Sequence, residues 1–428
     1  MQLSRIAVAA AFGLAVLPDL RAAAPGWPGW RGPSRDALST ETGLASQWPA
    51  GGPPLAWKAT GMGAGFSSVA VVDDRIYTMG DRDGAQYLLA LDAKDGSLVW
   101  KSRVGPTWND EYGGPRGTPS VDGGTVYAMG TEGDLVAVEA ATGKERWRRS
   151  LPSDFGGRVM SMWKWAESPL VDGDRVIVTP GASAATLVAL DKATGKEIWR
   201  SAVPDLGPAG KDGAGYASVV ISNASGVKQY VQLLGRGLVG VRASDGKFLW
   251  GYNRVANQVA NIATPIVRAN WAFASTGYQT GAGLVELSKS GEGVKASELY
   301  FLPAKTFQNH HGGMVLVGNH IYSGNGQSKG FPICIEFTTG KVVWGGDIRN
   351  AGTGSAAVVY ADGNLYYRYQ NGVVMLIQAT PDGYHERGSF TIPGVDHPSW
   401  SHPVVAGGKL YLREQDTLYV YDVRAARS

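Results

Sequence analysis

The sequence predicts an all-β protein, an eight-bladed β-propeller made of four-stranded antiparallel blades. A sequence pattern of strand, turn and second strand, which ends in an aromatic residue, recurs at intervals of 43 to 52 residues. The 60 glycines suit many tight turns, and the 14 Trp and 18 Tyr suit a repeated packing residue. The two chain ends carry complementary parts of one such unit. Periods of this length are typical of propeller blades, whereas the repeats of a linear β-solenoid are much shorter.

The first half of each unit is predicted to be a short hairpin. Its clearest copy is residues 118–127, where alternating apolar residues flank an Asp-Gly-Gly turn. Alternation of this kind around turn residues is typical of two short antiparallel strands. Parallel copies lie at residues 168–177, 264–273, 311–322, 355–366 and 402–411.

The second half of each unit is an apolar strand, a Thr-Gly-Lys turn and a fourth strand that carries an aromatic residue. In residues 189–199 the turn glycine, Gly195, lies four residues before Trp199. This spacing indicates a turn that needs a positive φ. Because the aromatic residue recurs at one register, we expect it to pack against the next blade. The aromatic residues of the eight fourth strands are Trp57, Trp100, Trp147, Trp199, Trp250, Tyr300, Trp344 and Phe390.

The two ends of the chain are expected to share the last blade. Residues 402–421 supply three strands without a fourth, and residues 55–58 form a fourth strand without a preceding blade. Pairing them would close the ring and remove its exposed sheet edges. The predicted organisation is a signal peptide over residues 1–24, an N-terminal extended segment over 25–54 and one propeller domain over 55–428.

The N-terminus indicates export. Arg5 precedes a short apolar run, and Ala22 to Ala24 offer a cleavage site for a signal peptidase. The run is shorter than the roughly 20 residues that span a bilayer. The only cysteine, Cys334, excludes an internal disulfide and leaves no lipid-bearing cysteine after the signal. We expect a monomeric periplasmic or secreted protein without a transmembrane segment after cleavage. The net charge of +3, without a basic run, gives no indication of nucleic-acid binding.

The repeated units, above all residues 189–199 with the pattern A-L-D-x-x-T-G-K-x-x-W, resemble the pyrroloquinoline-quinone (PQQ) repeat propellers over about residues 57–421. That family includes quinoprotein alcohol and glucose dehydrogenases. It also includes non-enzymatic propellers such as the lipoprotein scaffold of the outer-membrane barrel-assembly machine. The chain departs from the dehydrogenases because it lacks their vicinal cysteine pair and any C-x-x-C-H haem motif. It departs from the scaffold because it lacks the lipobox cysteine. The resemblance favours the non-enzymatic branch.

The segments that connect consecutive blades are predicted to carry the functional site. They are longer than the hairpin turns, and they precede the innermost strands, which surround the central channel. Adjacent His310 and His311 would point to opposite faces if extended, so at most one is expected to face a shared site. The candidates for ligand binding are Arg116, Trp163, Trp165, Asn257, Asn261, Asn309, His310, His311, Trp400 and His402.

These residue types suit a planar polar ligand. Arg116 would pair with an acidic group of that ligand, and Trp163 or Trp165 would offer a stacking face. Glu167, Asn261 and Asn309 carry the oxygen atoms that Ca²⁺ prefers. Glu167 or Asp110 would serve as the base of a dehydrogenase. A purely structural interpretation is the alternative. Loop Trp and Asn residues often pack against or cap their own loops, and an Arg–Glu pair at the rim can be a surface ion pair of little energy.

Two functions follow from the sequence. The favoured one is a binding or scaffolding module of the cell envelope, without catalysis or cofactor, that binds an envelope protein or a small polar ligand. The alternative is a PQQ- and Ca²⁺-dependent oxidoreductase of alcohols or sugars, with its site at the mouth of the central channel. Polysaccharide binding or cleavage is a third option, which the loop tryptophans encourage. The chain carries no G-x-S-x-G elbow and no P-loop.

Overall fold

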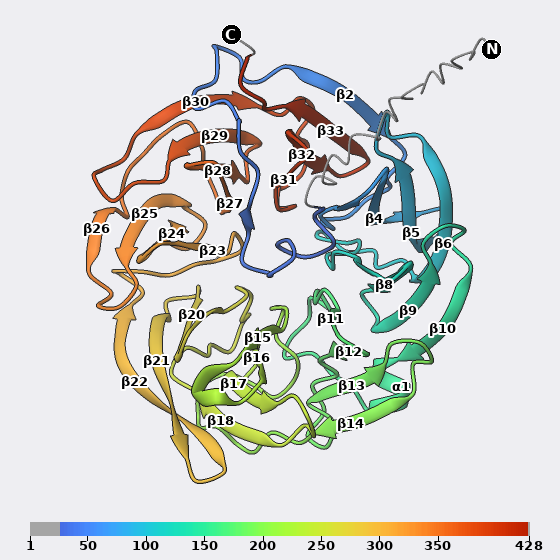
Figure 1. Cartoon of the computed structure of the whole chain (residues 1–428), viewed down its shortest axis with the longest axis vertical. Helices are drawn as coiled ribbons and strands as arrows, with labels where there is room; N and C mark the ends of the chain where they lie inside the picture. Colours follow the sequence, from blue (N-terminus) through green and yellow to red (C-terminus); the bar gives the residue numbers. More distant parts are fainter. Residues whose placement is uncertain (1–25, 427–428) are drawn as a thin grey trace, which may run out of the picture.

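Eight β-sheets are arranged as blades around one axis, which confirms the predicted eight-bladed propeller (Figure 1). The computed structural model describes residues 26–426, so the predicted signal peptide lies outside the described residues. Within each blade, consecutive strands pair antiparallel, from an innermost first strand to an outermost fourth strand. None of the helices in the described part of the chain is long and apolar enough to cross a membrane.

The first four blades follow each other along the chain. The first contains β3 (Ala70–Val72), β4 (Arg75–Arg82), β5 (Ala85–Asp92) and β6 (Leu98–Pro106). The second contains β7 (Ser120–Asp122), β8 (Thr125–Met129), β9 (Asp134–Glu139) and β10 (Glu145–Ser150), and α1 (Leu151–Phe155) follows it. The third contains β11 (Leu170–Asp172), β12 (Arg175–Val178), β13 (Leu187–Asp191) and β14 (Glu197–Ser201). The fourth contains β15 (Val220–Ser222), the 3₁₀ turn η1 (Ala224–Gly226), β16 (Gln229–Leu234), β17 (Gly237–Arg242) and β18 (Phe248–Tyr252).

The last four blades complete the ring. The fifth contains β19 (Ile266–Arg268), β20 (Trp271–Thr276), β21 (Gly281–Ser290) and β22 (Gly293–Pro303). The sixth contains β23 (Met314–Val317), β24 (His320–Asn325), β25 (Phe331–Glu336) and β26 (Val342–Gly345). The seventh contains β27 (Ala356–Ala361), β28 (Asn364–Tyr369), β29 (Val373–Gln378) and β30 (Glu386–Thr391), with β1 (Leu38–Ser39) beside β27. The eighth contains β31 (Val404–Ala406), β32 (Lys409–Glu414), β33 (Thr417–Asp422) and β2 (Leu55–Thr60).

Four of the repeated tryptophans, Trp100, Trp147, Trp199 and Trp344, donate a hydrogen bond to a backbone carbonyl oxygen of the next blade. Nε1 of Trp147 donates a hydrogen bond to the Lys192 carbonyl oxygen of the following blade at 2.9 Å. The turn glycine of that blade, Gly195, lies so close that an added Cβ would be 2.7 Å from the Trp147 ring. Trp250 differs, because its Nε1 donates to Gln229 of its own blade. The blade that follows it has a long hairpin from β21 to β22 in place of the Thr-Gly-Lys turn.

The ring is closed as the sequence predicted. The N-terminal strand β2 pairs antiparallel with β33, and Lys58 lies opposite Tyr419 in that pairing. The last blade therefore takes its outermost strand from the beginning of the chain and its other three from the end.

The N-terminal segment that precedes β2 crosses the middle of the ring (dark blue in Figure 1). Trp27 forms a β-bridge with Val71 of the first blade. The Arg35 guanidinium donates to the carbonyl oxygens of Ser168 and Pro169 in the third blade. The segment then reaches the seventh blade, where β1 pairs parallel with β27. The sequence predicted an extended segment here, but not its path through the channel.

Candidate functional site

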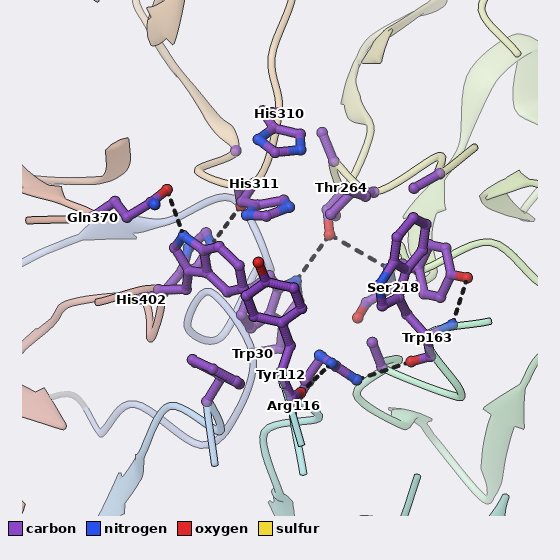
Figure 2. A pocket seen from close by; sticks show the side chains of 18 of the residues that line it. Trp30, Tyr112, Arg116, Trp163, Ser218, Thr264, His310, His311, Gln370 and His402 are labelled. Carbon is purple, nitrogen blue, oxygen red and sulfur yellow. Dashed lines mark hydrogen bonds between the residues drawn. The ribbon is translucent and has the colours of Figure 1, made fainter. Parts of the chain in front are cut away.

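A cavity of about 400 Å³ lies where the connections between blades converge on the axis. Figure 2 shows aromatic, imidazole and guanidinium side chains from several connections and from the N-terminal segment around this space. Six of the predicted ligand-binding residues line the cavity, namely Arg116, Trp163, His310, His311, Trp400 and His402. Other lining side chains are Trp30, Arg31, Phe66, Tyr112, Tyr216, Ser218, Thr264, Tyr278, Ser328 and Gln370.

The amides predicted as ligands lie outside the cavity wall, where their side chains form hydrogen bonds with backbone atoms. Asn257 accepts hydrogen bonds from Val259 and Ala260, so it caps its own loop. Asn261 Oδ1 accepts from the Asn257 backbone N–H. Asn309 Oδ1 accepts from Gly313 N–H, and its Nδ2 donates to Ser323 Oγ.

The remaining sequence candidates also lie apart from the cavity. Trp165 is buried in the core of the second and third blades, and its Nε1 donates to the Thr179 carbonyl. Glu167 is 2% exposed, and its two carboxyl oxygens accept from the backbone N–H and hydroxyl of Thr179. Burial raises the pKa of Glu167 to about 8. Asp110 is exposed and is not part of the cavity wall.

The two adjacent histidines both line the cavity, so the expectation that at most one faces it is wrong. Their rings stack with centroids 3.6 Å apart at an angle of 24°. The chain bends at residues 311 and 312, and the opposite-face rule holds only for extended backbone. His310 Nδ1 lies 2.8 Å from Ser355 Oγ, and its Nε2 lies 3.1 Å from the Tyr278 hydroxyl.

The cavity combines neutral imidazoles with charged guanidiniums. Burial lowers the pKa of His310 to about 4 and that of His402 to about 3, and it holds the pKa of His311 well below its usual value. All three imidazoles are therefore neutral at pH 7. Burial also lowers the pKa values of Arg31 and Arg116 to about 10, which leaves both guanidiniums charged.

The Arg116 guanidinium is held by neutral partners. It donates to the backbone carbonyl oxygens of Trp163 and Tyr112. Its central carbon lies 4.3 Å from the centroid of the Trp108 ring. Among residues 26–426, no Asp or Glu side chain lines the cavity, so these positive charges face the space without a carboxylate in its wall.

Two residues that sequence reasoning missed come from the N-terminal segment. Trp30 lines the cavity and donates from Nε1 to Thr264 Oγ1 at 2.9 Å. Arg31 also lines it and is 4% exposed. The repeat pattern could not place them, because the segment lies outside the repeats. The one local signal is its density of Trp, Gly, Pro and Arg over residues 26–33.

Three residues of the cavity wall other than glycine have a positive φ, and they are Arg31 (60°), Tyr278 (54°) and Ser328 (50°). Lys164 (59°) and Gln279 (63°) have a positive φ beside the wall residues Trp163 and Tyr278. Such conformations cost of order 1–3 kcal/mol each and cluster at binding and active sites.

The oxygen atoms predicted for calcium do not form a cation site. Within residues 26–426, no group of three or more His, Cys, Asp or Glu side chains is placed to hold a metal ion. The side-chain oxygens of Glu167, Asn261 and Asn309 already accept hydrogen bonds from the protein. Because Ca²⁺ takes six to eight oxygen ligands, this donor set does not fit it.

Residues 84–346 match a family model, PQQ_2, described as outer membrane protein assembly factor BamB. The curated relatives include the serine/threonine-protein kinase AfsK of Streptomyces griseus, 30% identical over 38% of this chain and 19% of the relative. BamB of Alkalilimnicola ehrlichii is 29% identical over 32% of each chain. The chain thus spans a fifth to a third of the length of these two. Tetrathionate hydrolase of Acidithiobacillus ferrooxidans is 24% identical over 86% of this chain and 76% of the relative.

Solved structures share the fold at low identity. BamB from Moraxella catarrhalis superposes with a TM-score of 0.62 and 14% identity, over 86% of this chain and 99% of that chain. The quinohemoprotein alcohol dehydrogenase from Comamonas testosteroni superposes with a TM-score of 0.64 and 13% identity, over 95% and 82%. These likenesses establish the propeller architecture.

Proposed function

The chain belongs to the PQQ-repeat propeller family whose model is described as outer membrane protein assembly factor BamB, and from this premise we propose that it is an exported binding module of the cell envelope that takes a small planar anion in its axial cavity. Export rests on the N-terminal sequence pattern, and the envelope setting rests on the family description. The nature of the ligand rests on the cavity.

The observation that carries the proposal is the make-up of the cavity wall. Flat indole faces from Trp30, Trp163 and Trp400 surround a space of about 400 Å³, a size suited to a small molecule. Arg31 and Arg116 supply positive charge in the same wall. Guanidiniums recognise carboxylate-like groups with paired N–H donors, and aromatic faces stack on planar ligands. A planar anion satisfies both features.

The second candidate function is a PQQ-dependent oxidoreductase. PQQ is an aromatic tricarboxylate, so its shape and charge match the cavity wall. The residues predicted to hold Ca²⁺ do not fit that ion, and the candidate bases Glu167 and Asp110 lie outside the wall. The geometry therefore favours binding of such a molecule over calcium-dependent dehydrogenation.

A sulfur oxyanion is a further ligand to test. The relative with the widest coverage among those described above is named tetrathionate hydrolase, and tetrathionate is a small dianion. Unlike PQQ it is not planar, so the two compounds separate recognition of charge from recognition of an aromatic plane.

The test is titration of the exported chain, beginning near residue 25, with PQQ and with tetrathionate, each with and without Ca²⁺. Heat and tryptophan fluorescence report binding. We expect one-to-one binding of PQQ that is independent of Ca²⁺, and Arg116→Gln should weaken it at least tenfold. Arg148→Gln is the control, because Arg148 is bonded at the rim of the second blade, away from the cavity.

Absence of binding of either compound at high micromolar concentration would exclude the proposed ligand class. Binding that requires Ca²⁺, together with reduction of an artificial acceptor by an alcohol or a sugar, would establish the oxidoreductase instead.

A further inference from the structure

We propose that the Tyr278 hydroxyl, held in place by His310 and Ser355, donates a hydrogen bond to the ligand and selects compounds that carry an uncharged carbonyl oxygen. The inference rests on the proposed function and deepens it. It assigns a side chain that recognises a neutral group of the ligand rather than its charge.

Three hydrogen-bonded side chains, Ser355, His310 and Tyr278, form a chain that ends in the cavity wall. His310 Nδ1 lies 2.8 Å from Ser355 Oγ, and His310 Nε2 lies 3.1 Å from Tyr278 Oη. The Tyr278 ring stands edge-on to the imidazole, with ring centroids 5.2 Å apart at an angle of 79°. Ser355 is 5% exposed, whereas Tyr278 lines the cavity and is partly exposed. The chain thus runs from the protein interior to a side chain that a ligand can reach.

The hydrogen atoms of this chain are assigned by counting donors and acceptors. Within residues 26–426, the Ser355 hydroxyl has no other hydrogen-bond partner than the imidazole, so its O–H donates to His310 Nδ1. The one proton of the neutral imidazole is then on Nε2, which donates to the Tyr278 oxygen. The O–H of Tyr278 has no acceptor in the described part of the chain. One donor in the cavity wall is therefore left for an acceptor atom of a ligand.

Tyr216 lines the same cavity, but its hydroxyl proton is already used. Ser161 Oγ donates to the Val259 carbonyl oxygen at 2.9 Å, so Tyr216 is the donor in its 3.0 Å contact with Ser161 Oγ. The Trp163 backbone N–H donates to the Tyr216 oxygen. Tyr216 is thus a matched control, because it shares the wall with Tyr278 and has no free donor.

The backbone of Tyr278 is fixed as well. Tyr278 and Gln279 lie in the turn between β20 and β21, with φ of +54° and +63°. Gln327, in the turn between β24 and β25, accepts from the Tyr278 backbone N–H at 2.6 Å. Because both its backbone and its hydroxyl are bonded, Tyr278 loses little freedom when it binds a ligand.

The surroundings of the hydroxyl favour a neutral acceptor. The side chains bonded to Tyr278 and His310 are Gln327, Ser328 and Ser355, and none of them carries a charge. Burial lowers the pKa of His310 to about 4 and raises the pKa of Tyr278, so both stay uncharged at pH 7. A charged oxygen at this place would have no counter-ion among these neighbours, whereas a ring carbonyl needs none.

The experiment compares the wild type with Tyr278→Phe and Tyr216→Phe. The probes are fluorenone carboxylates and the fluorene carboxylates with the same substitution, so that the members of a pair differ only in the carbonyl group. Pairs substituted at two different ring positions present the carbonyl on different sides. We expect the wild type to bind the ketone of at least one pair about two- to tenfold more tightly, the range of a neutral hydrogen bond.

Tyr278→Phe should abolish this preference, because it removes only the donor. Any effect of Tyr216→Phe on affinity should be equal for the two members of a pair. Heat and tryptophan fluorescence report binding, as for PQQ.

Nitrogen NMR of the labelled protein tests the hydrogen assignment without a ligand. We expect a protonated Nε2 and an unprotonated Nδ1 for His310, whose signals are identified by their loss in His310→Gln. Ser355→Ala removes the donor to Nδ1 and should reduce the preference for the ketone in a protein that keeps Tyr278.

The outcomes separate the two proposals. If the wild type binds neither PQQ nor any of the aromatic acids, both fail. If it binds the acids without preferring a ketone, or if Tyr278→Phe keeps the preference, the proposed function stands and the donor is wrong. A proton on His310 Nδ1 overturns the assignment independently of ligand binding. If Tyr278→Phe does not fold, the wild-type preference, Ser355→Ala and the NMR result decide the same question.

Discussion

Arg368 is a fully buried cation on β28 whose guanidinium is surrounded by oxygen atoms from the last blade. It donates to Glu414 Oε2 at 2.8 Å, to Ser399 Oγ and to the Ser401 carbonyl. Neither side chain of the ion pair is more than 4% exposed. Removing one member of such a pair leaves an uncompensated buried charge, which costs about 3–5 kcal/mol.

We therefore expect Glu414→Gln to reduce the free energy of unfolding by about 3–5 kcal/mol, measured by urea denaturation. The control is Asp212→Asn, which removes the exposed ion pairs to Arg158 and Arg236. That change should cost less than about 1 kcal/mol. Equal losses in the two variants would mean that burial does not set the strength of the Arg368 pair.

The three cavity histidines make the protein sensitive to acid. Their pKa values in the fold, about 4 for His310, about 3 for His402 and well below the usual value for His311, lie under the roughly 6.5 of an unfolded chain. Below pH 6.5 the unfolded chain therefore binds protons that the folded chain does not. The stability that these residues contribute is present above pH 6.5 and is lost as the pH falls toward 4.

We expect the urea midpoint to fall between pH 6.5 and pH 4, and we expect His402→Gln to flatten this decline. Glu167 acts in the opposite direction, because its raised pKa of about 8 removes stability as the pH rises from about 4.5 to 8. The measured quantity is therefore the difference between wild type and variant at each pH. His385→Gln, at an exposed position, should leave the slope unchanged. A His402→Gln slope identical to that of the wild type would contradict the assignment.

At the scale of elements, the contact between Trp147 and the turn at Gly195 is an example of the packing between neighbouring blades. Gly195 has φ of +69°, and an added Cβ would lie 2.7 Å from the Trp147 ring. Gly173 has a similar φ of +61°, but nothing lies within 4 Å of its would-be Cβ. The two glycines thus differ in packing and share their backbone conformation.

We expect Gly173→Ala to cost about 1 kcal/mol from backbone strain alone. Gly195→Ala should cost about 1–3 kcal/mol more, because the indole must move. Thermal unfolding of both variants measures the difference. Equal costs would show that the indole does not lock the blades together.

At the scale of the whole molecule, the last blade is completed by a pairing between the two ends of the chain. Thr60 of β2 lies opposite Thr417 of β33, and the latter is partly exposed. A disulfide between cysteines at these positions would close a loop of more than 350 residues. A disulfide between residues 409 and 422, which are paired within the same blade, would close a loop of about a dozen.

Because a cross-link constrains the unfolded chain more when its loop is longer, the Thr60→Cys/Thr417→Cys variant should gain about 3 kcal/mol more than Lys409→Cys/Asp422→Cys. Melting temperatures of the oxidised and reduced forms give the two gains. A smaller gain for the ring-closing disulfide would show that this pairing does not limit unfolding.

Local periodicity was sufficient to predict the architecture. All eight predicted aromatic residues lie on the outermost strands, because each repeat encodes its own turn and its own anchor. Closure was predictable for the same reason, since β2 carries the register of a fourth strand and lacks a blade of its own. The connections between blades are longer than the turns within blades. This difference in length also indicated the end of the propeller at which the cavity lies.

The sequence by itself therefore determined the blades, their number and their closure. Each blade depends on residues within about 50 positions of each other, and the two chain ends carry complementary parts of one such unit. Only the tertiary structure decided which connection residues share the cavity. Asn309 and His310 are adjacent, yet Asn309 accepts a hydrogen bond from a backbone N–H and His310 lines the cavity. Arg31 reaches that space because its segment crosses the channel, a path set by contacts with the first, third and seventh blades. Contacts between such distant residues leave no periodic trace in the sequence.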